Sequence, residues 1–347
     1  MHIQDLETPS VLIDLDIMER NIQRMQARCN ALGIDFRPHI KTHKIPDIAR
    51  RQLEAGAVGI ACQKVTEAQV FAEAGIDDIQ IPYIVIGAAK ARRLAELARR
   101  VRVTAAADSL PGVEGLAAAA RQAGVVLRVL VDLATSIQRT GAPPALAIDL
   151  ARCIDSEPSL HFGGMLVYPS TVDSRPALLE VLQQLDRDGI AVEAVSGGGS
   201  GAALEAADFP ELTELRVGTY VFYDWSSVGK GWAQQSDCAM TVAATVISRP
   251  DDDRATLDSG SKALAADRWA DGHGHIVEYP DAHIHTLSEE HAHVDLSRCQ
   301  HKPAVGERVH VIPVHTCVVT NLHNQIYGVR NGQVEVEWPV AARGLLW

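Results

Sequence analysis

Short apolar runs alternate with helical patterns over the first two thirds of the chain. Most runs are followed by a stretch with apolar residues three and four positions apart, often ending near a glycine. We predict strands over residues 34–39, 57–62, 78–82, 101–106, 127–132, 161–168, 191–196 and 214–221. Strands that alternate with helices in this way indicate a (β/α)₈ barrel. A doubly wound open sheet is the alternative, but the glycine-rich nucleotide turn after its first strand is missing here.

The pattern changes near residue 224. Further runs predict strands with no long helix between them, over residues 240–248, 255–258, 275–279, 282–287, 308–313, 325–329 and 333–338. Asn331 and Gly332, between the last two runs, favour a tight hairpin turn. We therefore predict two domains, which are the barrel over residues 12–230 and an all-β domain over residues 231–347.

The composition excludes several classes of partner. The chain has 347 residues, 47% of them apolar, which suffices for two domains or for a barrel with an appendage. Its formal net charge of −12 argues against nucleic acid or an anionic membrane surface as a partner. No apolar run reaches membrane-spanning length, and no signal-peptide pattern is visible. The six cysteines are scattered, so we expect mostly reduced thiols in a cytoplasmic protein.

Residues 37–44, Arg-Pro-His-Ile-Lys-Thr-His-Lys, include the end of the first predicted barrel strand and precede a helix that Pro46 can open. A lysine in such a loop faces the mouth of a barrel, where barrel enzymes place their chemistry. If the strand pattern continues, His39, Lys41 and His43 share one face. Nearby positive charge lowers the pKa of an amine, as a Schiff-base lysine requires. Most lysines are solvated surface charges, so the spacing alone leaves both interpretations open.

Two glycine-containing stretches follow or lie in the last two predicted barrel strands. Residues 195–201 read Val-Ser-Gly-Gly-Gly-Ser-Gly, and residues 216–219 read Arg-Val-Gly-Thr. Glycine-rich backbone can present several N–H groups to an anion, and barrels commonly bind phosphate after strands seven and eight. The alternative interpretation is a pair of tight turns without a ligand.

Histidine is concentrated near the end of the chain, where ten of the fourteen histidines lie after residue 270. Several occur as pairs two positions apart, which places both side chains on one face of a strand. Such pairs can supply half of a site for a borderline metal, and the candidates are His273/His275, His283/His285, His291/His293 and His315/Cys317. Exposed loop histidines are common, so spacing does not distinguish these pairs from solvated side chains.

The stretch at residues 37–44 resembles the pyridoxal-phosphate segment of the D-threonine aldolase and D-serine dehydratase family, part of the alanine-racemase-like class. The resemblance is strongest at residues 7–45, 195–220, 256–264 and 287–344. It implies that Lys41 binds pyridoxal 5'-phosphate covalently and that Lys44 is a surface or supporting neighbour. It also implies that residues 10–14 pair with the β domain, so we assign residues 1–11 to that domain.

The same resemblance implies a set of cofactor-binding residues. The loops that hold the cofactor phosphate correspond to Ser196, Gly198, Gly199, Gly218 and Thr219. Arg216 corresponds to the arginine that faces the pyridine nitrogen, Arg139 to an arginine near the phenolic oxygen, and Tyr168 to a tyrosine beside the cofactor. Gln63 is a weaker polar candidate. Two stretches depart from the family pattern, namely residues 133–137, which replace an Asp-Thr-Gly-like run, and residues 169–171, which lack a histidine that serves as a base in relatives.

Residues 314–317, followed by 321–323 and 338–344, resemble the metal-binding C-terminus of the family. The resemblance implies that His315 and Cys317 bind a divalent metal (Mn, Mg or Zn), with water or substrate as the remaining ligands. Residues 287–291 match another family segment, which we expect beside the substrate or behind the metal ligands. We expect the other histidine pairs to be solvated loop residues.

The resemblance implies a lyase, dependent on pyridoxal phosphate and a divalent metal, that acts on D-3-hydroxy amino acids as small-molecule substrates. We favour cleavage to glycine and an aldehyde, with Lys41 and Tyr168 as catalytic residues and Tyr168 or a water molecule replacing the missing histidine. Dehydration of D-serine or 3-hydroxy-D-aspartate to a 2-oxo acid and ammonia is the alternative. A racemase, with Tyr279 or Tyr327 as its base, and a non-catalytic cofactor carrier also stay open. The family implies a homodimer.

Overall fold

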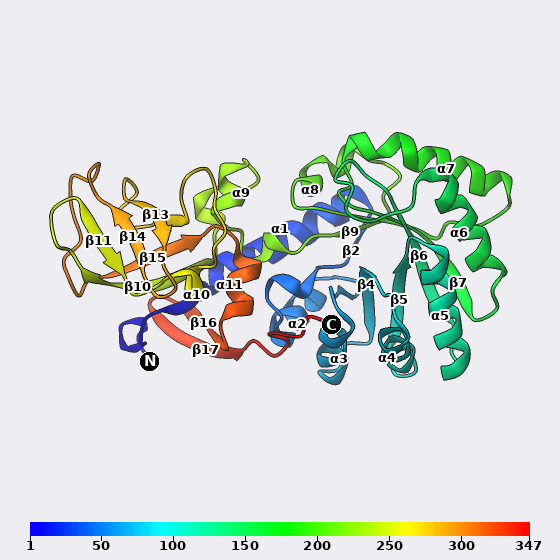
Figure 1. Cartoon of the computed structure of the whole chain (residues 1–347), viewed down its shortest axis with the longest axis horizontal. Coiled ribbons are helices and arrows are strands. Elements are labelled where there is room, and N and C mark those ends of the chain that lie inside the picture. The colour runs from blue at the N-terminus through cyan, green and yellow to red at the C-terminus, as the bar shows by residue number, and fades with distance from the viewer. The chain divides into compact units, whose positions relative to one another are not determined.

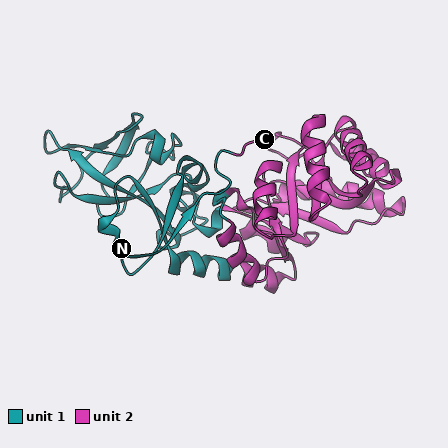
Figure 2. Cartoon of the chain, turned by 90° about the horizontal axis from the view of Figure 1, so that it is seen from below, with its two compact units in different colours: residues 1–24, 42–45, 219–344 teal, residues 25–41, 46–218, 345–347 magenta.

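The computed structural model describes all 347 residues and divides into two compact units (Figure 2). The barrel unit comprises residues 25–41, 46–218 and 345–347, and the β unit comprises residues 1–24, 42–45 and 219–344. The predicted boundary lay at residue 230, and of the N-terminal residues only 1–11 were assigned to the β domain. The predicted division therefore differs from the division into these two units. No helix is long and apolar enough to cross a membrane.

The barrel unit is built on eight parallel strands in the order β2-β9-β8-β7-β6-β5-β4-β3 (Figure 1). Their bounds are β2 Asp35–Phe36, β3 Ile60–Ala61, β4 Asp78–Ile84, β5 Arg102–Ala107, β6 Leu127–Leu133, β7 Leu160–Val167, β8 Ala194–Gly198 and β9 Glu214–Arg216. A parallel bridge between His39 and Ala61 joins the continuation of β2 to β3, the two ends of this path. The predicted (β/α)₈ fold class is confirmed.

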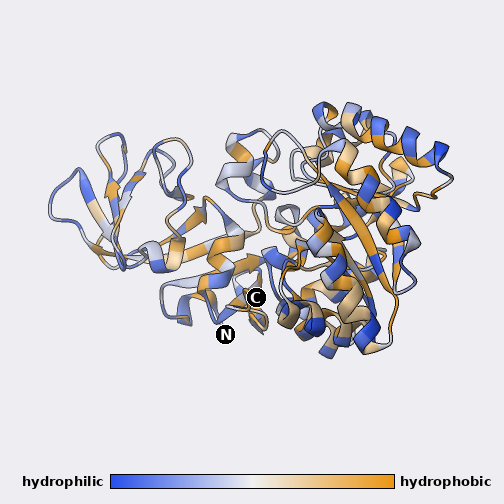
Figure 3. Cartoon of the chain, turned by 45° about the vertical axis from the view of Figure 1, so that its right-hand side comes forward, coloured by the Kyte–Doolittle hydropathy of each residue, from blue (hydrophilic) through white to orange (hydrophobic).

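Helices connect the barrel strands, namely α2 Pro46–Glu54, α3 Val65–Glu73, α4 Ala88–Ala98, α5 Leu110–Ala123, α6 Pro144–Ser156, α7 Arg175–Arg187 and the short α8 Ala202–Glu205. They are amphipathic; α5, for example, buries Val113, Leu116 and Ala120 on one face. Gly124 ends α5 in the left-handed conformation, with φ of 68°. In Figure 3 the strands of the barrel unit are mostly hydrophobic, whereas the helices also carry hydrophilic positions.

The β unit contains a sheet in the order β13-β14-β11-β10-β1-β16-β17, with β15 pairing β10 and β12. The strands are β1 Ser10–Asp14, β10 Met240–Ser248, β11 Arg254–Leu257, β12 Gly274–Ile276, β13 His283–Leu287, β14 Ala292–Asp295, β15 Arg308–Pro313, β16 Gln325–Arg330 and β17 Gln333–Pro339. Three short helices interrupt them, namely α9 Trp225–Gly229, α10 Ser261–Leu264 and α11 Thr316–Leu322. Strand β1 pairs with both β10 and β16, as the resemblance implied for residues 10–14.

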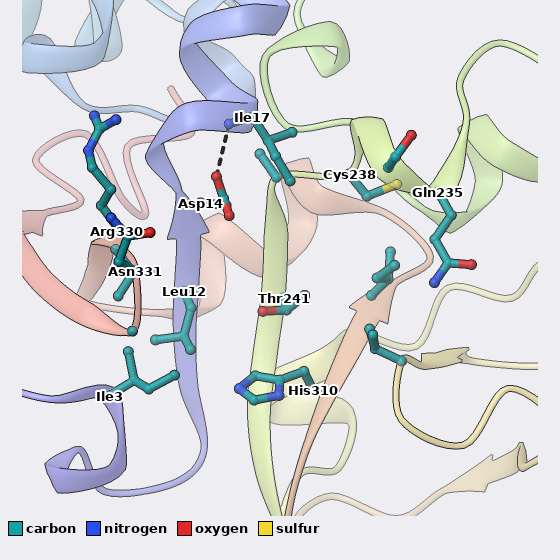
Figure 4. Close-up of a pocket in the computed structure, with 16 residues that line it drawn as sticks. Ile3, Leu12, Asp14, Ile17, Gln235, Cys238, Thr241, His310, Arg330 and Asn331 are labelled. Carbon is teal, nitrogen blue, oxygen red and sulfur yellow. Dashed lines mark hydrogen bonds between the residues drawn. The ribbon is translucent and has the colours of Figure 1, made fainter.

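Helix α1 (Leu15–Leu32) follows β1 directly, and the division between the two units falls within it, after Arg24. The Asp14 carboxylate accepts a hydrogen bond of 2.9 Å from the Ile17 backbone N–H and so satisfies one free donor of the first turn (Figure 4). Gly33 ends the helix at a φ of 66°.

Several local predictions were wrong. The strand before Lys41 does not continue, because Ile40–Thr42 form a 3₁₀ turn, and His39, Lys41 and His43 therefore do not share a strand face. Residues Thr219–Val221 also form a 3₁₀ turn instead of extending β9. Strand β14 was not predicted, because it has only four residues and two of them, His293 and Asp295, are polar.

Candidate active site

The C-terminal end of β8 forms a cradle of backbone, defined here as residues 196–199. A Cβ atom on Gly198 would lie 2.9 Å from the Arg216 carbonyl oxygen and 3.2 Å from the Tyr168 ring, so no side chain fits there. Gly199 has a φ of 116°, which favours glycine. The backbone N–H groups of Ser200 and Gly201 donate no hydrogen bond within the protein, and neither does that of Gly218. Unpaired N–H groups on bare backbone are suited to an anion such as phosphate.

Arg216 is the fixed cation of this cradle. It is buried, and its guanidinium donates to the Ser196 hydroxyl at 3.0 Å and to the Ser196 carbonyl oxygen at 3.2 Å. Burial lowers the pKa of Arg216 to about 10, while the negative charges of Glu214 and Asp132 oppose that shift. The guanidinium therefore stays charged at neutral pH, and its Nη1 would lie 3.3 Å from a Cβ on Gly198.

Tyr168 and Arg139 lie beside the cradle, on the side of Gly198. The Arg139 guanidinium carbon lies 4.5 Å from the centre of the Tyr168 ring, which is a cation–π arrangement. The Tyr168 carbonyl oxygen accepts a hydrogen bond of 2.6 Å from the Thr135 hydroxyl. The Ser170 hydroxyl is buried and donates to the Gly198 carbonyl oxygen at 3.4 Å. The structure thus brings Tyr168, Arg139 and Arg216 together around the cradle.

Lys41 is half-buried in the 3₁₀ turn that follows β2. Its backbone N–H donates to His39 Nδ1 at 3.4 Å, and His39 Nε2 lies 2.9 Å from Gln63 Oε1. Because Nδ1 accepts, Nε2 carries the ring proton and donates to Gln63. Gln63 therefore orients the histidine that lies beside Lys41.

The last two residues of the motif, His43 and Lys44, have structural roles. His43 is fully buried, and its Nδ1 accepts a hydrogen bond of 3.1 Å from the Ile45 backbone N–H just before α2. Lys44 was expected at the surface or behind the site. It is buried instead, with its Nζ 3.4 Å from the Ala342 carbonyl oxygen and a positive φ of 57°. A surface location for Lys44 is therefore wrong, because the C-terminal segment covers it.

In the β unit, His315 and Cys317 lie at the start of α11. The Cys317 side chain, hydrogen-bonded to His315, raises the pKa of His315 to about 9 against the opposing effect of burial. His315 Nδ1 also lies 3.3 Å from Asp267 Oδ1, and Cys317 Sγ lies 3.3 Å from the Thr42 hydroxyl. The Thr219 hydroxyl lies 3.9 Å from Cys317 Sγ, so its side chain faces this pair. No group of three or more His, Cys, Asp or Glu residues is arranged to hold a metal ion.

The remaining histidine pairs are not simply solvated. His273 and His275 are buried, and His275 stacks on Trp225 with ring centres 4.0 Å apart. His283, His285 and His293 lie on β13 and β14, with neighbouring ring centres 6.3 and 6.2 Å apart. We expected solvated loop histidines. His273 and His275 differ from this expectation because they are buried, and His283, His285 and His293 differ because they lie in strands.

Residues 287–291 meet the turn before α10 through their backbone. The carbonyl oxygens of Ser288 and Glu289 accept hydrogen bonds from Ser261 N (2.9 Å) and Lys262 N (3.1 Å). A Cβ on Gly260 would overlap both carbonyl oxygens, so only glycine fits at this position. The segment therefore supports the start of α10.

A pocket of about 610 Å³ in the β unit is lined by none of the predicted site residues (Figure 4). Its walls come from β1, β10, β15 and β16 and include Leu12, Thr241 and His310. His310 is held by Glu278, whose carboxylate accepts from the His310 backbone N–H at 2.9 Å and lies 2.5 Å from His310 Nδ1. We assign no catalytic role to this pocket.

Comparison with known proteins identifies the family. The model described as "Alanine racemase, N-terminal domain" matches residues 13–224, and the model described as "Putative serine dehydratase domain" matches residues 239–329. The chain belongs to the alanine racemase N-terminal domain family. The resemblance inferred from residues 37–44 is therefore confirmed.

Relatives within the family match over nearly the whole chain. A D-threonine aldolase from Arthrobacter sp. is 35% identical over 98% of this chain and 93% of its own length. The crystal structure of D-threonine aldolase from Filomicrobium marinum superposes with a TM-score of 0.93, at 30% identity over 99% of this chain and 98% of that one. D-threo-3-hydroxyaspartate dehydratase from Delftia sp. HT23 superposes with a TM-score of 0.89, at 27% identity over 97% and 98% of the two chains. A cysteine-to-alanine variant of such a dehydratase has a structure in the metal-free form.

The family resemblance did not point to Asp132, at the C-terminal end of β6. This side chain is buried and accepts a hydrogen bond of 2.8 Å from the Thr140 hydroxyl. Burial raises the pKa of Asp132 to about 6, although Thr140 and the positive charges of Arg216 and Arg139 oppose the shift. A single carboxylate at the end of an apolar strand was the available signal in the sequence.

We predict that Asp132→Asn becomes more stable relative to the wild type as the pH rises from about 4 to 6. The pKa of Asp132 is raised from 3.8 to about 6, so its stabilising contribution is present below 3.8 and is lost as the pH passes through the raised value. The difference should grow by about 3 kcal/mol and stay constant above pH 7. Urea unfolding of the cofactor-free protein measures it, with the exposed Asp149→Asn as control. A difference that is independent of pH would contradict the prediction.

Proposed function

We propose that this protein is a lyase that uses pyridoxal 5'-phosphate and a divalent metal to cleave D-3-hydroxy amino acids into glycine and an aldehyde. The observation that carries the proposal is the cradle at the end of β8, where unpaired backbone N–H groups lie beside a fixed arginine and a tyrosine. The likeness to D-threonine aldolases over nearly the whole chain supports the reaction class.

The residues of the cradle fit the cofactor. The unpaired N–H groups of Ser200 and Gly201 would hold its phosphate, together with that of Gly218. Arg216 would face the ring from the buried side, and Tyr168 with Arg139 would form a wall. When bound, pyridoxal phosphate acts as an electron sink for the bonds around the substrate α-carbon.

His315 and Cys317 fit a divalent metal as a pair of protein ligands. A thiolate and an imidazole suit a borderline ion such as Zn²⁺, with Mn²⁺ and Mg²⁺ as the alternatives. Asp267, at 3.3 Å from His315 Nδ1, would orient the ring and leave Nε2 for the metal. A metal at this pair would polarise the 3-hydroxyl of the substrate as a Lewis acid.

Three residues of the barrel unit have proposed roles in handling the substrate. The Lys41 amine would hold the cofactor covalently, and His39 fixes the backbone of that turn. Tyr168 takes the proton of the 3-hydroxyl, because the histidine found in relatives is missing at residues 169–171. Ser170 cannot replace it, since its hydroxyl is buried and donates to Gly198.

A dehydratase is the second candidate, favoured by the likeness to D-threo-3-hydroxyaspartate dehydratase. Dehydration needs a group that protonates the departing hydroxyl, and residues 169–171 offer no strong acid. We therefore favour carbon–carbon cleavage.

The reaction is tested by its products. D-threonine, D-serine and D-3-hydroxyaspartate are incubated separately with the protein, metal and pyridoxal phosphate, and glycine and ammonia are measured. We expect glycine with an aldehyde from D-threonine and no turnover of L-threonine, the control. Ammonia with a 2-oxo acid and no glycine from any of the three would establish the dehydratase instead.

We further propose that the protein acts in the cytoplasm as a homodimer. All six cysteines are free, as expected for a reducing compartment. The dimer rests on the family resemblance alone, and light scattering of the purified protein measures it directly.

A further inference from the structure

Arg37, the first residue of the lysine motif, lies away from the cradle. It is buried, and its guanidinium donates to Asp78 Oδ1 at 2.6 Å and to Glu214 Oε2 at 2.7 Å. Gly59 leaves the space that it occupies, since a Cβ there would overlap Nη1 of Arg37. Arg37 and Glu214 also line a polar pocket of about 720 Å³ in the barrel unit. None of the roles proposed above explains this arginine.

Glu214 connects Arg37 to the cradle. Its second oxygen, Oε1, accepts a hydrogen bond from the Ser196 hydroxyl, which in turn accepts one from Arg216 Nε at 3.0 Å. We call the series Arg37–Glu214–Ser196–Arg216 the buried ladder. Its members have at most 8% of their surface exposed, and Gln80 adds a hydrogen bond of 3.3 Å to the Ser196 hydroxyl. The ladder therefore joins two buried arginines through one carboxylate.

The charges of the ladder depend on one another. Burial raises the pKa of Glu214, but Arg37, Ser196 and Arg216 outweigh it, so the net pKa is lowered and the carboxylate is ionised. Arg37 also pairs with Asp78, but Glu214 is the carboxylate that acts on both guanidinium groups, so its charge stabilises the two together. Asp132 and Tyr168 are the other groups that act electrostatically on Arg216.

We propose that Glu214 is a positioning residue, which holds Arg216 in place through Ser196 and sets the electrostatic potential at the cofactor ring, with Arg37 as its counter-ion. This inference rests on the proposed function, since it requires pyridoxal phosphate in the cradle. The negative charge of Glu214 partly offsets the positive charge of Arg216. Any proton on the bound cofactor is therefore held more tightly than beside Arg216 alone.

The test is the pH titration of the bound cofactor in Glu214→Gln, which keeps the shape of the side chain and removes its charge. Loss of a negative charge lowers the pKa of neighbouring groups, so the midpoint of the absorbance change, and of kcat, should fall by about one unit. Glu214→Asp keeps the charge and should leave the midpoint within about 0.3 unit of the wild type. Glu193→Gln is the matched control, because Glu193 pairs with Arg128 at 3.2 Å and lies outside the ladder.

The double variant Arg37→Gln/Glu214→Gln removes both charges and should return the midpoint toward the wild-type value. A purely structural role would lower stability in all ladder variants without this reversal. An unchanged midpoint in Glu214→Gln, with cofactor bound, overturns the inference. Failure of the wild type to bind pyridoxal phosphate overturns the proposed function instead. If Glu214→Gln does not fold, Arg37→Gln decides instead: loss of a positive charge raises the pKa of neighbouring groups, so its midpoint should rise above the wild-type value, and an unchanged midpoint overturns the inference.

Discussion

Replacing Lys41 with alanine is expected to abolish turnover and to leave a protein without the absorbance of covalently bound cofactor. The amine is proposed to bind the cofactor covalently, so its loss removes the bond on which cofactor retention and turnover depend. We expect activity to fall by at least about 10³-fold. Absorbance spectroscopy and steady-state kinetics measure the two losses.

Lys44→Ala is the informative control for Lys41, because Lys44 belongs to the same motif. Its Nζ contacts the Ala342 carbonyl oxygen, so its loss should reduce stability but leave the cofactor bound. Borohydride reduction followed by peptide mapping should find the cofactor on Lys41 in the wild type. Mapping to Lys44, or no label on either lysine, would contradict the central proposal.

Replacing His315 or Cys317 with alanine is expected to remove the metal and nearly all activity while the cofactor stays bound. Only two protein side chains are available here, so losing one leaves a single ligand. Metal affinity should fall by at least about 100-fold, which is the upper end of the loss seen for supporting residues around metal sites. Calorimetry with Mn²⁺ and Zn²⁺ measures affinity, and chelation of the wild type should have the same effect on turnover.

His293→Ala and Cys299→Ala are matched controls in the same unit, because both residues lie outside the proposed pair. His293 bonds the Ser288 hydroxyl at 2.9 Å, and Cys299 is a buried free thiol. Both variants should keep metal affinity and turnover. Full activity in the His315→Ala/Cys317→Ala double variant would instead place the metal elsewhere or remove it from the mechanism.

The local pattern of apolar and polar residues was sufficient to predict the architecture of the protein. The alternation of apolar runs and helical stretches predicted the eight barrel strands, because hydrophobic periodicity is imposed residue by residue along each element. The predicted bounds of β10 and β15 agree with the structure at every residue. The family was also accessible from short segments, since residues 37–44 and the His315-x-Cys317 pair are contiguous in the chain.

Only the tertiary structure revealed which charges meet. Arg37 and Glu214 are 177 positions apart, and nothing in either segment indicates that they form a buried pair. The raised pKa of Asp132 likewise depends on burial, which no local pattern reports. Lys44 became a buried residue because the segment around Ala342 covers it. Periodicity and motifs are properties of neighbouring residues, whereas burial and electrostatics depend on distances that folding alone creates.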